Sequence, residues 1–366
     1  MDVLDRRALN RALLARQSLL VRDTRTPLEM VEHLLGLQAQ APFPPYFGLW
    51  TRLREFAPDT LARLLENRDV VRIVTLRGTV HLHSAADALV LRPFTQPVMD
   101  RDLRGHTMHT PRLAGVDLDR LAELARAALA ERPLANSQLA AALGTHWPEH
   151  GSTALAYAAR NLLPLVQVPP RAVWGRSGQP TYATAEDWLG KPLEKPDAER
   201  VILRYLAAFG PASVRDVQTW CGLTRLGEVV EGLRPRLRTF RTPEGRELFD
   251  LPEAPRPAAD TPAPVRFLPE FDNLLLSHAD RTRVIGEDDR KRIRTPNGIQ
   301  PAVFLVDGFV HGDWKIRRDK ESAVLEIRPF RRLSRKDTAA LTTEGRRLLR
   351  FAESADGDVR FVSEFS

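Results

Sequence analysis

The chain has 366 residues, of which 43% are hydrophobic and 28% charged, a balance typical of a water-soluble globular protein of roughly two to three domains. No apolar stretch approaches the roughly 18 residues that span a bilayer, the N-terminus lacks a signal-peptide pattern, and the single cysteine excludes an internal disulfide or a cysteine-based zinc cluster. We therefore expect a cytoplasmic protein, and the net charge of +7 favours a polyanionic partner, although a GC-rich genome would also enrich arginine.

Residues 1–110 have the outline of a winged helix. The second of its helices is opened by Thr26 as N-cap and Pro27 at the first helical position, and Arg77-Gly78 is predicted to be the turn of a β-hairpin. Helices are predicted over about 4–19, 27–38 and 59–67, and strands over 71–76 and 79–84. Three helices followed by a hairpin form a winged helix, a variant of the helix-turn-helix.

The same order of helices and strands recurs twice, as architecture rather than as a residue-level repeat. Residues 111–190 and 191–252 each contain amphipathic segments of helical period followed by short strand-like segments. The helices are predicted over about 117–131, 136–143, 152–163, 197–209, 213–221 and 224–234, and the strands near 164–168, 180–184, 236–241 and 246–250. The sequence therefore predicts three tandem winged-helix units.

A proline-rich linker at 251–264 precedes a strand-rich end, residues 265–366. Strands are predicted on both sides of Asp307-Gly308 and over 323–330 and 358–365, with one helix over about 336–355. The predicted fold class is therefore α+β, with three tandem winged-helix units followed by a C-terminal β-barrel-like domain.

Gln38 and Gln40 form the most informative short motif, because residues two apart share a face only where the chain is extended. In a helix their side chains point about 160° apart. Pro42 disfavours helix at Ala41, so we expect the second helix to end near 38–41 and Gln40 to turn toward the same cleft as Gln38. The alternative is that both glutamines finish a helix and solvate its last carbonyl groups.

Other polar residues carry weaker signals. His81 and His83 share a face of a predicted strand, but two histidines without a third ligand nearby favour hydrogen bonds at the base of the wing over a metal site. Asp272, Asn273, His278 and Asp280 lie in one loop-like stretch. They are either turn and capping residues or part of a loop that faces DNA or supports the site.

Basic residues cluster toward the C-terminus, interleaved with acidic ones. Such clusters are either a solvated charged face or contacts to DNA phosphates, which position a protein without reading sequence. They comprise Arg281, Arg283, Arg290, Lys291, Arg292, Arg294, Lys315, Arg317, Arg318, Lys320, Arg331, Arg332, Arg335 and Lys336. The chain has no GxxxxGKS/T, GxSxG or HExxH motif, which excludes the commonest NTPase, hydrolase and zinc-protease classes.

Gln38-Ala39-Gln40 resembles the Gln-apolar-Gln motif of the AlkZ-type DNA glycosylases, a winged-helix family whose broader members carry Gln-apolar-Asp. The resemblance extends along nearly the whole chain, through 77–82, 268–281 and 306–314. It implies tandem winged helices around a basic concave surface and excision of N7-alkylated purines from double-stranded DNA. Glutamine at position 40 places the chain nearer the members that unhook interstrand cross-links.

With this resemblance the sequence predicts a set of site residues. Gln38 and Gln40 are the expected catalytic pair. The expected DNA-binding residues are His278, Arg281, Arg283, Lys315, Arg317 and Arg318, and the expected supporting residues are Asp272, Asn273 and His81. Nothing in the sequence requires a cofactor, a metal or an obligate protein partner. We expect a monofunctional glycosylase associated with the nucleoid.

A glutamine pair suits this substrate on chemical grounds. Most glycoside hydrolases use two carboxylates, whereas an amide has no proton to give or take near neutral pH. A purine alkylated at N7 is already cationic and leaves without an added proton, so the enzyme need only place a water and stabilise the developing oxocarbenium. We therefore expect Gln38 and Gln40 to orient the attacking water together.

A cross-linked base is tied to both strands, so we expect an open cleft reached with little base flipping. Two alternatives to a glycosylase stay open at this point. One is a non-catalytic winged-helix transcriptional regulator with a single basic recognition helix, and the other is a protein whose winged helices mediate protein contacts.

Overall fold

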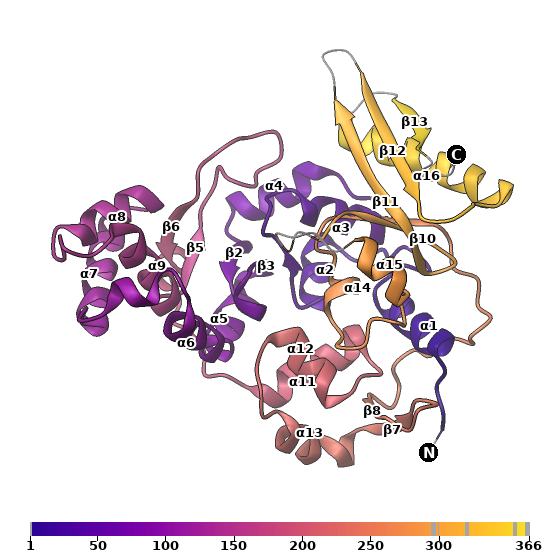
Figure 1. Cartoon of the computed structure of the whole chain (residues 1–366), viewed down its shortest axis with the longest axis horizontal. Helices are drawn as coiled ribbons and strands as arrows, with labels where there is room; N and C mark the ends of the chain where they lie inside the picture. Colours follow the sequence, from indigo (N-terminus) through magenta and orange to yellow (C-terminus); the bar gives the residue numbers. More distant parts are fainter. Residues whose placement is uncertain (1, 294–297, 299, 319–321, 354–356, 363–366) are drawn as a thin grey trace.

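The computed structural model describes residues 2–293, 298, 300–318, 322–353 and 357–362, and it combines helices with three β-sheets (Figure 1). Positions 354–355 and 363–365 of predicted elements, and Arg294 and Lys320 of the basic clusters, lie outside the described residues. In the part of the chain that is described, no helix is long and apolar enough to cross a membrane. The predicted α+β class is confirmed.

The N-terminal third combines short helices with the strands that carry the glutamine pair. Its helices are α1 (Arg6–Arg16), α2 (Pro27–His33), α3 (Pro44–Arg52), α4 (Pro58–Glu66), α5 (Ala85–Phe94) and α6 (Gln96–Gly105), and its strands are β1 (Leu37–Gln38), β2 (Val70–Val74) and β3 (Val80–Ser84). The predicted hairpin is present as β2 and β3, with Val74 opposite Val80. Strand β1 and helices α3, α5 and α6 are absent from the predicted elements.

Helix α2 is shorter than predicted and ends at His33. Leu35 adopts a left-handed backbone with a φ of 53°, and the Gly36 amide donates to the Val31 carbonyl over 2.9 Å. This Schellman-type closure satisfies a terminal helical carbonyl and releases the chain into the extended segment β1. Leucine gives no sequence signal for a left-handed turn, which is why the apolar pattern suggests a longer helix.

The middle of the chain follows the predicted order of helices and strands closely. Its elements are α7 (Leu118–Glu131), β4 (Leu134–Ala135), α8 (Asn136–Gly144), α9 (Ser152–Leu162), β5 (Leu165–Gln167), β6 (Thr181–Thr184), α10 (Ala185–Leu189), α11 (Ala198–Phe209), α12 (Val214–Cys221), α13 (Gly227–Leu233), β7 (Arg238–Arg241) and β8 (Glu247–Asp250). The first two predicted units share one sheet of order β1-β3-β2-β5-β6-β4, because β2 pairs with β5, whereas β7 and β8 form a separate hairpin.

The C-terminal part is an open sheet rather than a barrel. Its elements are β9 (Arg266–Leu268), α14 (Asn273–Leu276), α15 (Glu287–Arg292), β10 (Val303–Val306), β11 (Phe309–Arg318), β12 (Ala323–Pro329), α16 (Arg335–Glu353) and β13 (Asp358–Phe361). The strand order β13-β12-β11-β10-β9 is linear, and within the described ranges no pairing joins its two ends, so the predicted barrel-like closure is not found. Strands β11 and β12 project from the body of the protein (Figure 1).

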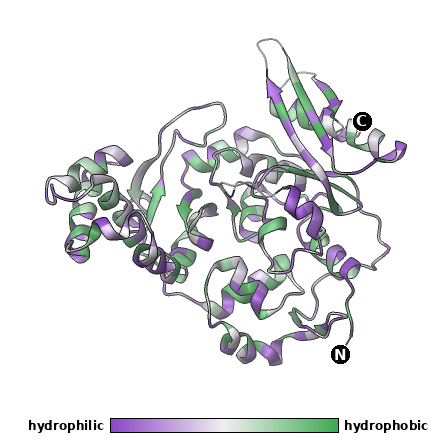
Figure 2. Cartoon of the chain, in the orientation of Figure 1, coloured by the Kyte–Doolittle hydropathy of each residue, from purple (hydrophilic) through white to green (hydrophobic). Residues whose placement is uncertain are grey.

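Alternating burial along β11 shows how this sheet forms its core. Every second residue from Val310 to Trp314 is buried, and Figure 2 shows hydrophobic and hydrophilic residues mixed along the projecting strands. On the apolar face, Leu341 and Leu348 of α16 pack with Phe267 of β9. Trp50 of α3 joins the same cluster, which holds the N-terminal unit against the C-terminal sheet.

Helix α1 links the N-terminus to the later parts of the chain. Leu13 belongs to a buried cluster with Tyr205 of α11 and Leu268 of β9. Arg16 forms a buried ion pair with Asp250 over 2.6 Å. Burying an ion pair stabilises little by itself, but losing either partner would leave a buried charge uncompensated, so the pair fixes how these segments meet.

Candidate active site at strand β1

Strand β1 places the glutamine pair beside the first hairpin. Gln38 lies opposite His81 of β3, and the amide of Ala39 donates to the Val80 carbonyl over 2.8 Å. The strand ends at Gln38, and Gln40 stands at the bend that follows. Gln38 is 6% exposed, whereas Gln40 is exposed. The alternative in which both glutamines finish a helix is wrong, because α2 ends before β1 begins.

Arg77 fixes the amide of Gln38. Its Nη2 donates to Gln38 Oε1 over 2.8 Å, and its Nη1 donates to the Trp220 carbonyl over 2.5 Å. Because a guanidinium can only donate, the amide atom that it contacts is the oxygen, and the Gln38 NH2 group points away. Arg77 has a φ of 57°, a left-handed conformation that costs about 1–2 kcal/mol for a residue other than glycine. Such strain recurs at functional sites.

Gln40 is held by the same hairpin. The Val80 amide donates to Gln40 Oε1 over 3.2 Å. Both glutamine oxygens therefore accept hydrogen bonds from the segment that runs from the β2–β3 turn into β3. A carbonyl oxygen has two lone pairs, so each keeps one acceptor position in addition to its NH2 donors.

The surroundings of Gln38 are electropositive. Burial, followed by the positive charge of Arg281, lowers the pKa of Arg77 to about 10. The pKa of Arg281 is itself lowered, mainly by burial and then by Arg290. Among the described residues Arg77 forms no ion pair with a carboxylate. Uncompensated cations at a partly buried site attract anionic groups such as phosphates.

His81 lies next to Arg77 and is a neutral imidazole. It is buried, its Nδ1 lies 3.0 Å from the Thr79 carbonyl, and its Nε2 lies 3.4 Å from Arg77 Nη2. Burial, followed by the charge of Arg77, keeps the pKa of His81 well below its ordinary value. The Thr79 carbonyl can only accept, so Nδ1 carries the proton and Nε2 faces Arg77 as an acceptor.

Asp272 and Asn273 lie beneath β1 in the segment between β9 and α14. Both oxygens of Asp272 accept hydrogen bonds from Arg52 of α3 at 2.8 Å, and both side chains are fully buried. Asp272 also accepts from the Leu274 amide over 2.9 Å and so caps α14. Asn273 Nδ2 donates to the Gly36 carbonyl over 2.7 Å, directly before β1. This segment holds β1 in place.

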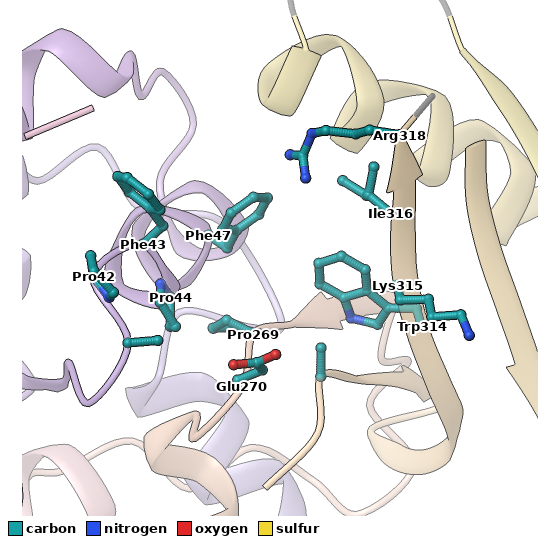
Figure 3. Close-up of a pocket in the computed structure, with 12 residues that line it drawn as sticks. Pro42, Phe43, Pro44, Phe47, Pro269, Glu270, Trp314, Lys315, Ile316 and Arg318 are labelled. Atoms are coloured by element: carbon teal, nitrogen blue, oxygen red, sulfur yellow. The ribbon is translucent and has the colours of Figure 1, made fainter. Parts of the chain in front are cut away.

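Two hollows share the lining residues Pro44, Pro269 and Glu270, and the smaller is also lined by Gln38. The larger has a volume of about 330 Å³ and lies between α3 and β11 (Figure 3). Its lining residues are Ala41, Pro42, Phe43, Pro44, Phe47, Pro269, Glu270, Ala302, Trp314, Lys315, Ile316 and Arg318. The smaller, a recess of about 10 Å³, is lined by Leu37, Gln38, Pro44, Pro45, Pro269, Glu270, Phe271, Asp272 and Asn273. Neither is a closed, purine-sized pocket beside Gln38.

Two of the residues predicted to contact DNA, His278 and Arg283, have buried side chains. His278 is 2% exposed, and its Nε2 lies 3.0 Å from the Phe209 carbonyl. Arg283 is 4% exposed and donates to the Pro211 carbonyl over 2.8 Å. Both side chains therefore hold the end of α11 and the segment that follows it. A basic residue in a polar stretch looks exposed in a sequence, and only the tertiary structure reveals its partners.

The remaining predicted DNA contacts lie near the site or on β11. Arg281 is half-buried and lies close enough to Arg77 for its positive charge to lower the pKa of Arg77. Arg317 and Arg318 are exposed near the end of the projecting strand, and Arg318 reaches into the larger hollow (Figure 3). Lys315 pairs with Glu326 of β12 over 3.3 Å.

Arg77 and Glu270 were not singled out among the candidate residues by the sequence pattern. Arg77 belongs to a predicted turn, where an arginine gives no sign that it will bend back onto Gln38. Glu270 follows β9 and has no special spacing. Both stand in stretches that carry the family resemblance, and this is the signal that marks them.

Comparisons with known proteins agree with the geometry. The model of the family described as "DNA glycosylase AlkZ-like" matches residues 31–351. A protein of Streptomyces sahachiroi named "Interstrand DNA cross-link repair glycosylase" is 27% identical over 376 residues, covering 95% of this chain and 96% of that protein. The solved structure of the Streptomyces sahachiroi DNA glycosylase AlkZ matches with a TM-score of 0.80 at 20% identity, covering 98% of this chain and 100% of that one.

These matches confirm the resemblance seen in the sequence and the mixed α+β architecture. They favour a glycosylase over a winged-helix regulator, because the family match spans both the glutamine pair and the C-terminal sheet. The chain belongs to the AlkZ-like family of DNA glycosylases.

Proposed function

We propose that this protein hydrolyses the N-glycosidic bond of N7-alkylated purines in double-stranded DNA and unhooks interstrand cross-links formed through such purines. Gln38 and Gln40 orient the attacking water. The observation that carries the proposal is the fixed geometry of the pair, since both amide oxygens accept hydrogen bonds from one hairpin, at 2.8 Å and 3.2 Å. No metal or cofactor is needed for this reaction.

The chemistry requires little from the protein beyond placement of the attacking water. The positive charge on an N7-alkylated purine weakens the bond between C1′ and N9, so the base leaves as a neutral molecule without a proton donor. The free lone pair of each glutamine oxygen accepts a hydrogen bond from the water, and the NH2 groups complete its orientation. Placement of a reactant in this manner lowers the barrier because the entropy of alignment is lost before reaction.

The substrate's bulk fits the open form of the site. A cross-linked purine stays joined to the opposite strand and cannot enter a closed pocket. The hollow between α3 and β11 is open to solvent and has a volume of about 330 Å³, which leaves room for an N7 substituent beside the base. The relative from Streptomyces sahachiroi, whose name refers to cross-link repair, supports this substrate class.

Basic residues around the site supply the contacts to the DNA backbone. Arg281 lies near Arg77, and Arg317 and Arg318 stand on the projecting strand β11. Contacts from these residues to phosphates would hold the duplex independently of sequence, as a repair enzyme requires. We interpret the three helix-and-hairpin repeats as winged-helix units that frame this surface and the protein as associated with the nucleoid.

The test uses duplex DNA with a single 7-methylguanine, followed by alkali and a sequencing gel. The wild-type chain is expected to give a nick at the lesion, and Gln38→Ala and Gln40→Ala each to lower the single-turnover rate by about 100-fold. Gln179→Ala, a replacement of an exposed glutamine, is the matched control. Wild-type rates in both motif variants would contradict the proposal.

A further inference from the structure

The two hollows beside Gln38 meet at Glu270. Pro44, Pro269 and Glu270 line both, so the recess that contains Gln38 lies directly next to the larger hollow, with the Glu270 side chain at their border. Figure 3 shows the Glu270 carboxylate in the gap between Pro44 and Trp314. Glu270 therefore borders both the space beside the catalytic amide and the space proposed for the lesion.

The recess has the size of one water molecule. Its volume is about 10 Å³, and a site needs about 10–15 Å³ on the same measure to hold a water. Gln38 lines one part of the recess and Glu270 another, so a water bound there would lie within reach of both an amide and a carboxylate. Asp272 and Asn273 also line the recess but are bound by Arg52 and the Gly36 carbonyl, which leaves Gln38 and Glu270 to orient the water. The other lining residues are apolar: Leu37, Pro44, Pro45, Pro269 and Phe271.

The backbone around Glu270 is held on both sides. Strand β9 before it pairs with β10, and Asp272 after it is bound by Arg52. Phe271, in between, has a φ of 57°, in the left-handed region that aromatic residues avoid. A strained residue persists only where its surroundings enforce it, and such positions cluster at active sites.

Glu270 is free to act on a substrate. Within the described part of the chain it makes no hydrogen bond or ion pair, its side chain is exposed to the hollows, and desolvation by the neighbouring groups alone raises its pKa. The other charged groups that line the hollows are Asp272, Lys315 and Arg318. Asp272 is bound by Arg52, Lys315 pairs with Glu326, and Arg318 lies at the far end of the larger hollow in Figure 3.

We propose that Glu270 is a third catalytic residue, the general base that takes a proton from the water oriented by Gln38 and Gln40. This inference rests on the proposed function. As the water oxygen forms its bond to C1′, the bond from C1′ to N9 breaks and its electron pair leaves with the cationic purine, which becomes neutral. One water proton passes to the Glu270 carboxylate, and the other stays on the new sugar hydroxyl.

A general base at Glu270 accounts for two features of the site. Neither amide can accept the proton that the attacking water must lose, whereas a carboxylate can. The site also holds the cations Arg77 and Arg281 near a transition state that is itself positive. A carboxylate without an ion-pair partner offsets that repulsion.

The test compares Glu270→Gln with wild type in single-turnover release of 7-methylguanine between about pH 5 and pH 8. We expect the plateau rate to fall by about 100-fold or more, the usual weight of a general base. The wild-type rate should rise with pH through one ionisation above the ordinary glutamate range, because only the ionised carboxylate accepts a proton. In Glu270→Gln this rise should disappear. Glu228→Gln, at an exposed position of α13, is the matched control.

The outcomes separate the two proposals. A wild-type chain that releases no 7-methylguanine refutes the proposed function itself. A wild-type chain that releases it, with the same rate and pH profile in Glu270→Gln, overturns the assignment of Glu270 alone. The affinity of Glu270→Gln for undamaged duplex should match wild type, and a loss of affinity as large as the loss of rate would also overturn the assignment. Glu270→Asp should keep the pH-dependent rise at a lower rate.

Discussion

Replacing Arg77 tests whether the orientation of Gln38 matters for catalysis. In Arg77→Gln the charged hydrogen bond to Gln38 Oε1, 2.8 Å long, is lost. Hydrogen bonds that involve a charged group contribute about 1.5–3 kcal/mol. Since each 1.36 kcal/mol corresponds to a tenfold change in rate, we expect single-turnover release of 7-methylguanine to slow by about 10- to 100-fold. Arg200→Gln, at an exposed position of α11, is the control.

A double variant separates positioning from a general effect on folding. If Arg77 acts through Gln38, then Arg77→Gln combined with Gln38→Ala should be no slower than Gln38→Ala alone, because the amide to be positioned is absent. A purely structural effect of Arg77 would instead multiply the two losses. Rates that multiply, or a wild-type rate in Arg77→Gln, would refute the reasoning.

The remaining predictions concern stability and DNA affinity. Asp272→Asn should lower the free energy of unfolding by about 3–5 kcal/mol in urea melts, because Arg52 keeps a buried charge without a partner. Asp288→Asn at the surface should change the free energy of unfolding by less than about 0.5 kcal/mol. Arg317→Gln should weaken binding to all duplexes alike and reduce the slope of log affinity against log salt by about one. Burial lowers the folded-state pKa of His278 to about 3. As the pH falls below about 6.5, only the unfolded chain therefore binds a proton at this histidine. Urea midpoints should decrease from pH 7 to about pH 5.

Each of these has an outcome that would contradict it. Equal melts for Asp272→Asn and Asp288→Asn would show that the Arg52 pair is replaced by other contacts. An unchanged salt slope in Arg317→Gln would remove that residue from the phosphate contacts. A stability that stays constant or rises on acidification would mean that His278 is protonated in the folded chain.

Local patterns predict the elements of this fold better than their ends and partners. The helices α7 to α9 and the hairpin at Arg77-Gly78 follow from apolar period and turn residues. Helix α2 ends early because Leu35 is forced into a left-handed turn, a conformation set by tertiary contacts and not by leucine itself. The open form of the C-terminal sheet also does not follow from local patterns, since strand order depends on which edges find partners.

The candidate site, too, is predicted only in part by the sequence. The spacing of Gln38 and Gln40, together with Pro42, predicts an extended pair on one face, and the strand register places Gln38 in extended chain opposite His81. What no spacing predicts is that Arg77 bends back onto Gln38 or that His278 lies inside the core. Those contacts join residues that are far apart in sequence or depend on a strained backbone, so they follow only from the assembled fold.

On the proposed mechanism, the charges around the site would produce discrimination against undamaged purines. An uncharged purine leaves only after a ring nitrogen has gained a proton, and Gln38 and Gln40 have none to give. Arg77, with a pKa of about 10, keeps its proton at neutral pH, and an ionised Glu270 removes protons rather than supplying them. A site built in this manner hydrolyses only a base whose positive charge is already present. On the proposed mechanism, selectivity for alkylated DNA therefore needs no tight pocket around the base, which is the one feature that a bulky or cross-linked lesion would not allow.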